Sequence, residues 1–197
     1  LSRYVGWGGL PDAFDSAKEN WSKEYTELKE ALTPEEYDSA RGSVLNAHYT
    51  SPAVIRAVYE ALEHIGFQSG NILEPSCGVG SFFGCLPESM AGSKLYGVEL
   101  DSISGRIAKQ LYPRAHITVA GFETTDRRDF YDLAVGNVPF GNYQVNDRAY
   151  NKLGFSIHNY FFAKALDQVR PGGIVAFLTS RYTMDAKDSA VRQYLAQ

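Results

Sequence analysis

The sequence has few cysteines and no long apolar run, and both absences narrow the class of protein. Its two cysteines, Cys77 and Cys85, lack Cys-x-x-Cys spacing, and its four histidines are scattered. We therefore expect no disulfide framework and no metal site. No apolar segment approaches the roughly 18 residues that span a bilayer, and the first residues do not resemble a signal peptide. These features predict a cytoplasmic protein with no membrane partner.

An excess of positive charge is also lacking, since the net charge is −4 at pH 7. This argues against a free-standing nucleic-acid binder with a strongly basic face, although it leaves room for an enzyme that meets nucleic acid through another domain. The 197 residues suffice for one full domain with an arm. Because the chain begins at Leu1 and reaches Gln197 within an apparent helix, we expect a piece of a longer polypeptide.

The sequence pattern of residues 1–45 predicts a helical N-terminal arm. Ser16 and Glu19 have the spacing of a capping box, and apolar residues then recur at helical intervals from Trp21. Thr33, followed by Pro34 and Glu36, predicts a second helix start. The glycines around Trp7 are interpreted as a packing turn, because no Lys-Ser/Thr follows to complete a phosphate cradle.

A third helix is predicted to begin at Ser51-Pro52 and to end at Gly66. Its apolar face is expected to consist of Val54, Val58, Leu62 and Ile65. Tyr49 and Thr50 precede this helix, where free N–H groups and the positive end of the helix dipole suit a carboxylate ligand. The alternative is that Thr50 and Ser51 only cap the helix.

From residue 71 the pattern changes to strands alternating with helices, which predicts a doubly wound parallel sheet over residues 46–197. A helix between the second and third strands is expected to carry Ile103, Ile107 and Leu111 on one face, and another is expected around residues 160–169. The five predicted strands are residues 71–73, 94–98, 115–119, 131–136 and 173–178.

The loop after the first strand, Glu74 to Gly80 (EPSCGVG), has the features of a nucleotide site. Gly78 and Gly80 permit a tight turn, and Glu99 ends the second strand about twenty residues later, as a carboxylate that binds ribose does. A third glycine, needed by a dinucleotide, is replaced by Phe83. Glu74 suits a cation such as an ammonium group, so S-adenosylmethionine is the better match. A lone Gly-x-Gly pair is also compatible with a simple tight turn.

Asn137, Val138, Pro139 and Phe140 stand at the end of the fourth strand. In open α/β sheets ligands bind beyond the carboxyl ends of the strands. An amide, a carbonyl and an aromatic face suit a flat heterocycle that carries an amino group. The alternative is a turn in which Asn137 caps the strand and Phe140 packs inward.

Together these segments resemble the motifs of amino-group DNA methyltransferases of the N6-adenine type. The resemblance rests on Glu74–Gly80, Gly97–Asp101 and Asn137–Gly141, with His48–Pro52 matching the motif that gamma-ordered members place before the first strand. The chain is most similar to methylase domains embedded in very large, helicase-containing proteins of mobile elements. The resemblance covers residues 45–185 and implies a Rossmann-like methyltransferase fold, without the final hairpin and the target-recognition domain.

By this resemblance, Tyr49, Thr50, Glu74, Ser76, Gly78 and Gly80 hold the methionine part of S-adenosylmethionine. Glu99 binds its ribose, and Phe122 packs on its adenine. The resemblance also implies that Asn137, Val138, Pro139 and Phe140 are catalytic. The family has an acidic residue where this chain has Gly121, and a proline where it has Val138. In the family that acidic residue binds the amino group of the cofactor's adenine, and here Glu123 or a backbone group would have to replace it.

The resemblance implies DNA as the partner, with the target adenine flipped out of the duplex, and helicase and target-recognition domains in the parent polypeptide. Two other functions remain open, namely methylation of a protein glutamine and a non-catalytic module that binds cofactor or DNA. Basic residues interpreted as DNA contacts or as solvated surface are Arg127, Arg128, Arg148, Lys152 and Arg181.

Overall fold

The computed structural model describes residue 4 and residues 6–44 and 49–197. The helical segments in chain order are η1 (Pro11–Phe14), η2 (Glu19–Trp21), α1 (Ser22–Ala31), α2 (Pro34–Ser43), α3 (Pro52–His64), α4 (Ser81–Gly84), η3 (Glu88–Met90), α5 (Ser102–Leu111), η4 (Phe122–Thr124), η5 (Asn151–Leu153), α6 (Ile157–Gln168), α7 (Tyr182–Asp185) and α8 (Ala190–Leu195). The strands are β1 (Asn71–Glu74), β2 (Lys94–Glu99), β3 (His116–Val119), β4 (Tyr131–Asn137) and β5 (Val169–Leu178).

The strands form one parallel sheet in the order β3-β2-β1-β4-β5, which confirms the predicted doubly wound sheet. The chain runs outward in one direction from β1 to β3 and then crosses back to β4, on the other side of β1. The order therefore reverses between β1 and β4, where two loops diverge and leave room for a ligand. The five strands lie where the sequence predicted them, with β5 beginning four residues early, at Val169.

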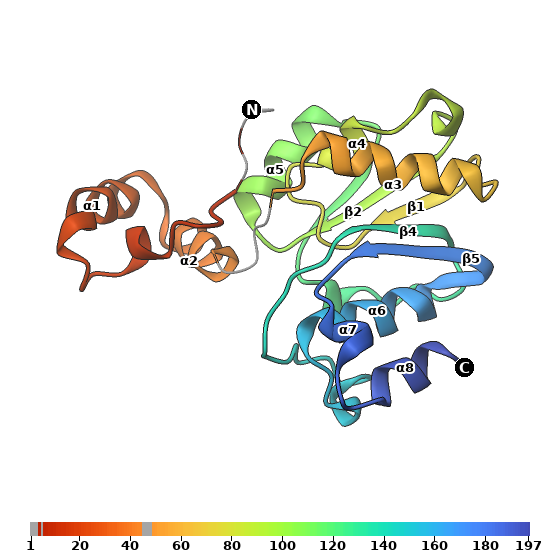
Figure 1. The fold of residues 1–197 in the computed structure, drawn as a ribbon. Helices are drawn as coiled ribbons and strands as arrows, with labels where there is room; N and C mark the ends of the chain where they lie inside the picture. Colours follow the sequence, from red (N-terminus) through yellow and green to blue (C-terminus); the bar gives the residue numbers. More distant parts are fainter. Residues whose placement is uncertain (1–3, 5, 45–48) are drawn as a thin grey trace.

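Helices cover both faces of the sheet, with α3, α4 and α5 on one side and α6, α7 and α8 on the other (Figure 1). Alternate residues of each strand supply the two cores. Ile72 and Leu133 pack with Tyr59 of α3, whereas Leu73 and Ala134 pack with Tyr160 of α6. Burial on both faces explains why the strands are short continuous apolar runs.

The N-terminal arm forms a lobe of its own around α1 and α2, beside the sheet (Figure 1). Its small core contains Phe14 and Tyr37, and α2 has the predicted capping box between Thr33 and Glu36. Ser39 of α2 ties the arm to the first residue of α5, because its hydroxyl accepts a hydrogen bond from the Ser102 backbone N–H at 3.0 Å. The proposed domain boundary at residues 45 and 46 lies outside the described residues.

Two expectations about helices were wrong. The capping box at Ser16 does not form, and α1 begins at Ser22 after a short 3-10 turn. On α3 the buried face is Ile55, Tyr59 and Leu62, while Val54 and Ile65 are exposed.

Helix α5 forms where it was predicted, with Ile103, Ile107 and Leu111 half-buried, and its fully buried face carries the small residues Ser104, Gly105 and Ala108. The small face lets α5 approach β3, because a side chain at Gly105 would meet Val119. Gly66 ends α3 in a left-handed conformation, as predicted. No helix in the described part of the chain has the length and apolar character needed to cross a membrane.

Candidate functional site

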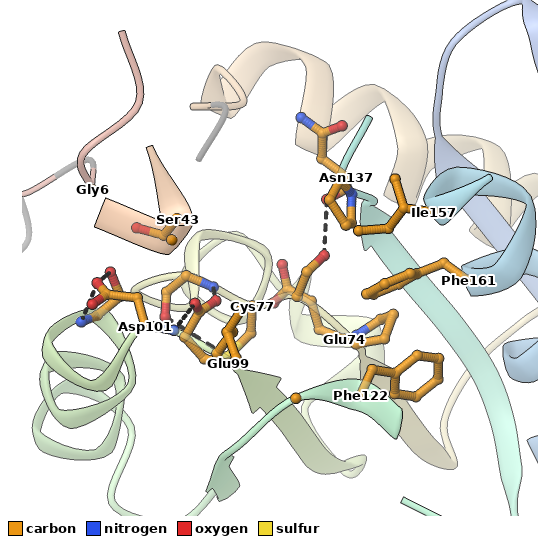
Figure 2. Close-up of a pocket in the computed structure, with 18 of the residues that line it drawn as sticks. Gly6, Ser43, Glu74, Cys77, Glu99, Asp101, Phe122, Asn137, Ile157 and Phe161 are labelled. Atoms are coloured by element: carbon orange, nitrogen blue, oxygen red, sulfur yellow. Dashed lines mark hydrogen bonds between the residues drawn. The ribbon is translucent and has the colours of Figure 1, made fainter. Parts of the chain in front are cut away.

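Three polar residues end the three central strands: Glu74 ends β1, Glu99 ends β2 and Asn137 ends β4. Because β2, β1 and β4 are neighbours in the sheet, these side chains meet at one edge. They line a single cavity of about 590 Å³. In Figure 2, Glu99 and Asp101 lie on one side of Glu74, while Phe122 and Phe161 lie on the other.

Glu99 holds the glycine loop in place. Its Oε2 atom accepts a hydrogen bond from the Gly78 N–H at 2.7 Å, and its Oε1 atom accepts one from the Asp101 N–H at 2.7 Å. Burial nevertheless raises the pKa of Glu99 to about 7, and these backbone N–H groups only partly oppose it. Each carboxylate oxygen keeps a second lone pair, which a ligand hydroxyl group can use.

Glu74 is 3% exposed, and its Oε2 atom is buried without a hydrogen-bond partner among the described residues. Burial and the nearby charge of Glu99 raise the pKa of Glu74 well above its ordinary value. A buried acceptor of this kind favours a ligand with a positively charged donor, because such a group satisfies the oxygen and stabilises the ionised form together.

Asn137 is held by its neighbours in one orientation. Its backbone carbonyl accepts a hydrogen bond from the Ser76 hydroxyl at 3.0 Å, and its side-chain Nδ2 donates to the Thr50 hydroxyl at 3.0 Å. The side-chain Oδ1 is buried and has no hydrogen-bond partner in the described part of the chain. The amide therefore offers a free acceptor.

The far end of the cavity is apolar. Phe122 lies in the turn after β3 and packs on Phe161 of α6, with ring centroids 5.0 Å apart. Ile157, also on α6, lines the same end. Such a slot accepts a flat ring, although Phe122 is only 3% exposed and leaves little of its own surface for a ligand.

The structure brings most of the predicted site residues together. The cavity is lined by Tyr49, Thr50, Glu74, Ser76, Gly78, Glu99, Phe122, Asn137 and Pro139. Tyr49 is largely exposed at its rim. His48, which opens the predicted N-terminal motif, lies outside the described residues.

Three predicted residues lie elsewhere. Gly80 faces Tyr112, where a side chain would overlap that ring, and its φ of +84° favours glycine. The side chain of Val138 is buried in the core, so this residue can reach a ligand only through its backbone. Phe140 lines a second cavity of about 610 Å³, next to the first, and Tyr143 lines both.

Sequence reasoning missed several lining residues. Asp101 belongs to the motif Gly97–Asp101, but no feature of the sequence assigned it a role. In the structure it lines the cavity and caps α5, because its carboxylate accepts a hydrogen bond from the Ser104 N–H at 3.0 Å. Gly6, Gly42 and Ser43 of the arm also line the cavity. No local signal identifies them, because their position depends on how the arm docks on the sheet.

The basic residues interpreted as DNA contacts divide into two groups. The Arg127 guanidinium lies over the Phe130 ring at 4.1 Å, and Arg128 forms an ion pair with Asp167 at 2.6 Å. All five residues are exposed, and Arg181 also lies over the Tyr182 ring, at 5.4 Å. Arg127 and Arg128 therefore contribute to packing as well, whereas Arg148, Lys152 and Arg181 form no ion pair with the described residues.

The chain is similar in sequence to proteins of restriction and modification. It is 32% identical over 143 residues to defense against restriction protein B of Escherichia phage P1, covering 70% of this chain and 6% of that protein. It is 34% identical over 93 residues to the type II methyltransferase M.CvrRI of Paramecium bursaria Chlorella virus XZ-6E, covering 47% of this chain and 24% of that protein. The chain thus spans a quarter or less of the length of these relatives. No protein-family model matches it.

Solved structures show the class of fold. A modification subunit of a putative type I restriction enzyme from Vibrio vulnificus YJ016 aligns over 91% of this chain and 43% of its own, with 17% identity and a TM-score of 0.59. TrmN from Thermus thermophilus aligns over 74% of this chain and 41% of its own, with 18% identity and a TM-score of 0.53.

The sheet order and the cavity beyond the ends of β1, β2 and β4 thus define the chain as a Rossmann-like S-adenosylmethionine-dependent methyltransferase fold. Within that class, the predicted resemblance to DNA methyltransferases is confirmed by sequence relatives that are named type II methyltransferases or a modification methylase.

Proposed function

We propose that this chain is the catalytic core of a DNA methyltransferase that transfers the methyl group of S-adenosylmethionine to the exocyclic amino group of adenine. The observation that carries the proposal is the unpartnered Oδ1 atom of Asn137. It lies in the same cavity as Glu74 and Glu99, so an amine acceptor and a cationic cofactor would meet there. The names of the type II methyltransferase relatives support DNA, rather than a protein glutamine, as the substrate.

The cavity suits the proposed cofactor at three points. The unpartnered Oε2 atom of Glu74 fits its ammonium group, and the remaining lone pairs of Glu99 fit its ribose hydroxyls. The apolar end at Phe122 and Phe161 fits its adenine. The bound cofactor supplies an electrophilic methyl group on a sulfonium centre.

Asn137 would act as an acceptor that makes the amine more nucleophilic. The lone pair of the adenine amino nitrogen is delocalised into the ring, and hydrogen bonds to acceptors favour a more tetrahedral nitrogen. The Oδ1 atom of Asn137 supplies one acceptor and the backbone carbonyl of Val138 the second. With the amine so oriented, the sulfonium of the bound cofactor would supply the methyl group and keep the electrons of its bond to carbon, and the nitrogen would release one of its protons to water. Orientation supplies much of the rate.

The second cavity gives the target base a place to enter. Phe140 lines it and directly follows Pro139, which lines the first cavity. A base flipped from the duplex would stack on Phe140 while its amino edge reaches Asn137. Exposed Arg148, Lys152 and Arg181 would contact the DNA backbone. Helicase and target-recognition domains of a longer parent protein would supply the remaining contacts.

The test is methyl transfer from labelled S-adenosylmethionine to unmethylated duplex DNA, followed by identification of the methylated nucleoside. We expect N6-methyladenine from the unmodified chain. Asn137→Ala should lower turnover at least a hundredfold while the dissociation constant of the cofactor stays within about twofold. Asn146→Ala is the matched control, because this amide lines the same cavity but its oxygen is already bonded to Asn151. Retained turnover in Asn137→Ala, or label on cytosine alone, would contradict the proposal.

A further inference from the structure

A fourth carboxylate, Glu123, lines the cavity at its aromatic end. The other three belong to Glu74 and Glu99, which end β1 and β2, and to Asp101, which follows β2. Asp101 and Glu99 accept backbone hydrogen bonds. Within the described residues, the Glu123 carboxylate accepts no hydrogen bond and forms no ion pair. It follows Phe122 directly, so it stands beside the slot that fits a flat ring.

The position of the Glu123 carboxylate depends on the absence of a side chain at Gly121. A Cβ atom built on Gly121 would overlap both carboxylate oxygens of Glu123. Gly121 has φ −70° and ψ 151°, a conformation open to any residue. The Glu123 carboxylate therefore occupies the space that a side chain at residue 121 would take.

A buried side chain of the core holds the backbone of the turn that carries Glu123. Lys164 is buried, with its side chain 4% exposed, and its Nζ atom donates to the Glu123 backbone carbonyl at 3.1 Å. The same Nζ atom pairs with Asp147 at 2.7 Å. The Thr124 hydroxyl donates to the Gly121 carbonyl at 2.8 Å. These contacts fix the backbone of the turn, so the Glu123 side chain starts from a defined point at the cavity wall.

We propose that Glu123 selects the base of the cofactor by accepting a hydrogen bond from the exocyclic amino group of its adenine. This inference rests on the proposed function, and it names a specificity residue within the same site. A carboxylate accepts hydrogen bonds and donates none when ionised. It therefore favours a purine with an amino group at this edge and disfavours one with a carbonyl oxygen, which would meet the carboxylate with another acceptor.

The test compares the binding of S-adenosylhomocysteine with that of its 6-oxo analogue, in which inosine replaces adenosine. We expect the unmodified chain to prefer the amino compound by about tenfold or more, as a charge-assisted hydrogen bond implies. In Glu123→Ala this ratio should fall to near one, because the amino compound loses affinity. Asp126→Ala is the matched control, since it removes an equal charge from an exposed neighbour that does not line the cavity.

Gly121→Ala gives an independent test. The added methyl group should displace the Glu123 carboxylate and lower the ratio as Glu123→Ala does, while the melting temperature stays unchanged because the backbone conformation suits alanine. An unaltered ratio in both variants, with tight binding of the amino compound retained, would overturn the role of Glu123 and leave the proposed function standing. Failure of the unmodified chain to bind S-adenosylhomocysteine would instead overturn the proposed cofactor and this inference together.

Discussion

Glu99 should couple cofactor binding to the release of a proton. Burial raises the pKa of this carboxyl from an ordinary value of 4.5 to about 7 in the ligand-free chain. Ribose hydroxyls that donate to it would stabilise its ionised form and lower that pKa. Binding therefore has to expel a proton from the fraction of molecules in which Glu99 is protonated, and the affinity should rise with pH until that fraction becomes small.

The size of the change in affinity follows from the pKa of about 7 that Glu99 has in the ligand-free chain. At pH 6 about one molecule in ten has an ionised Glu99, and at pH 8 about nine in ten, so affinity should rise about tenfold over this range. At pH 7 about half a proton should leave per ligand bound. The folded chain also binds more protons than the unfolded chain between pH 4.5 and about 7. The contribution of Glu99 to stability is therefore lost as pH rises through this window, by up to about 3 kcal/mol.

The assay is calorimetric titration with S-adenosylhomocysteine in buffers of different ionisation enthalpy, which counts the protons released. Glu99→Gln should bind more weakly and release fewer protons near pH 7. Glu74→Gln is the necessary comparison, because the pKa of Glu74 is raised as well and its pairing with the ligand ammonium would release protons too. The ammonium group of the ligand meets the same partners in Glu99→Gln and in the unmodified chain, so its titration cancels in that comparison. Proton release that is identical in Glu99→Gln and the unmodified chain would refute the reasoning.

Two further predictions concern stability. A Cβ atom at Gly97 would lie 2.8 Å from both Cys77 Sγ and Ile117 Cδ1, so Gly97→Ala should lower the free energy of unfolding by about 1–3 kcal/mol. Gly92→Ala, whose nearest heavy atom is 3.9 Å away, should change it little, and equal losses in urea denaturation would contradict the packing argument. Asp147→Ala should cost about 3–5 kcal/mol, because it leaves the buried Lys164 ammonium without its carboxylate, and a loss below about 1 kcal/mol would count against that role.

The ends of the strands were predictable from sequence because each is marked by an abrupt local change. Asn71–Leu73 and Tyr131–Gly136 are short runs rich in apolar residues that stop at polar and turn-forming residues, and in a parallel sheet such stops share one edge. Glu74, Glu99 and Asn137 can therefore be assigned to one site from the sequence alone. Their hydrogen bonds cannot, since the partners are up to 87 residues away, as with Thr50 and Asn137.

Helix faces were harder to predict because neighbouring stripes carry similar residues. On α3, Val54 and Val58 form one apolar stripe and Ile55 and Tyr59 the next. The buried stripe contains Tyr59, whose hydroxyl finds a partner in the Phe82 carbonyl at 3.1 Å, and this contact lies 23 residues away. Periodicity alone cannot decide between two stripes when the choice depends on such a contact.

The chemistry of the cavity favours an amine as the acceptor of the methyl group. Among the described residues that line it, none is histidine, lysine or arginine. Of its four carboxylates, Glu99 and Asp101 are engaged by backbone N–H groups, and Glu74 and Glu123 are the ones proposed to hold the cofactor. A hydroxyl nucleophile needs a base to remove its proton during attack. An amine does not, because its nitrogen becomes strongly acidic only after the new bond to carbon forms, and the proton then leaves to water. Oriented acceptors such as the Oδ1 atom of Asn137 are sufficient for that reaction, and they are what this edge of the sheet presents.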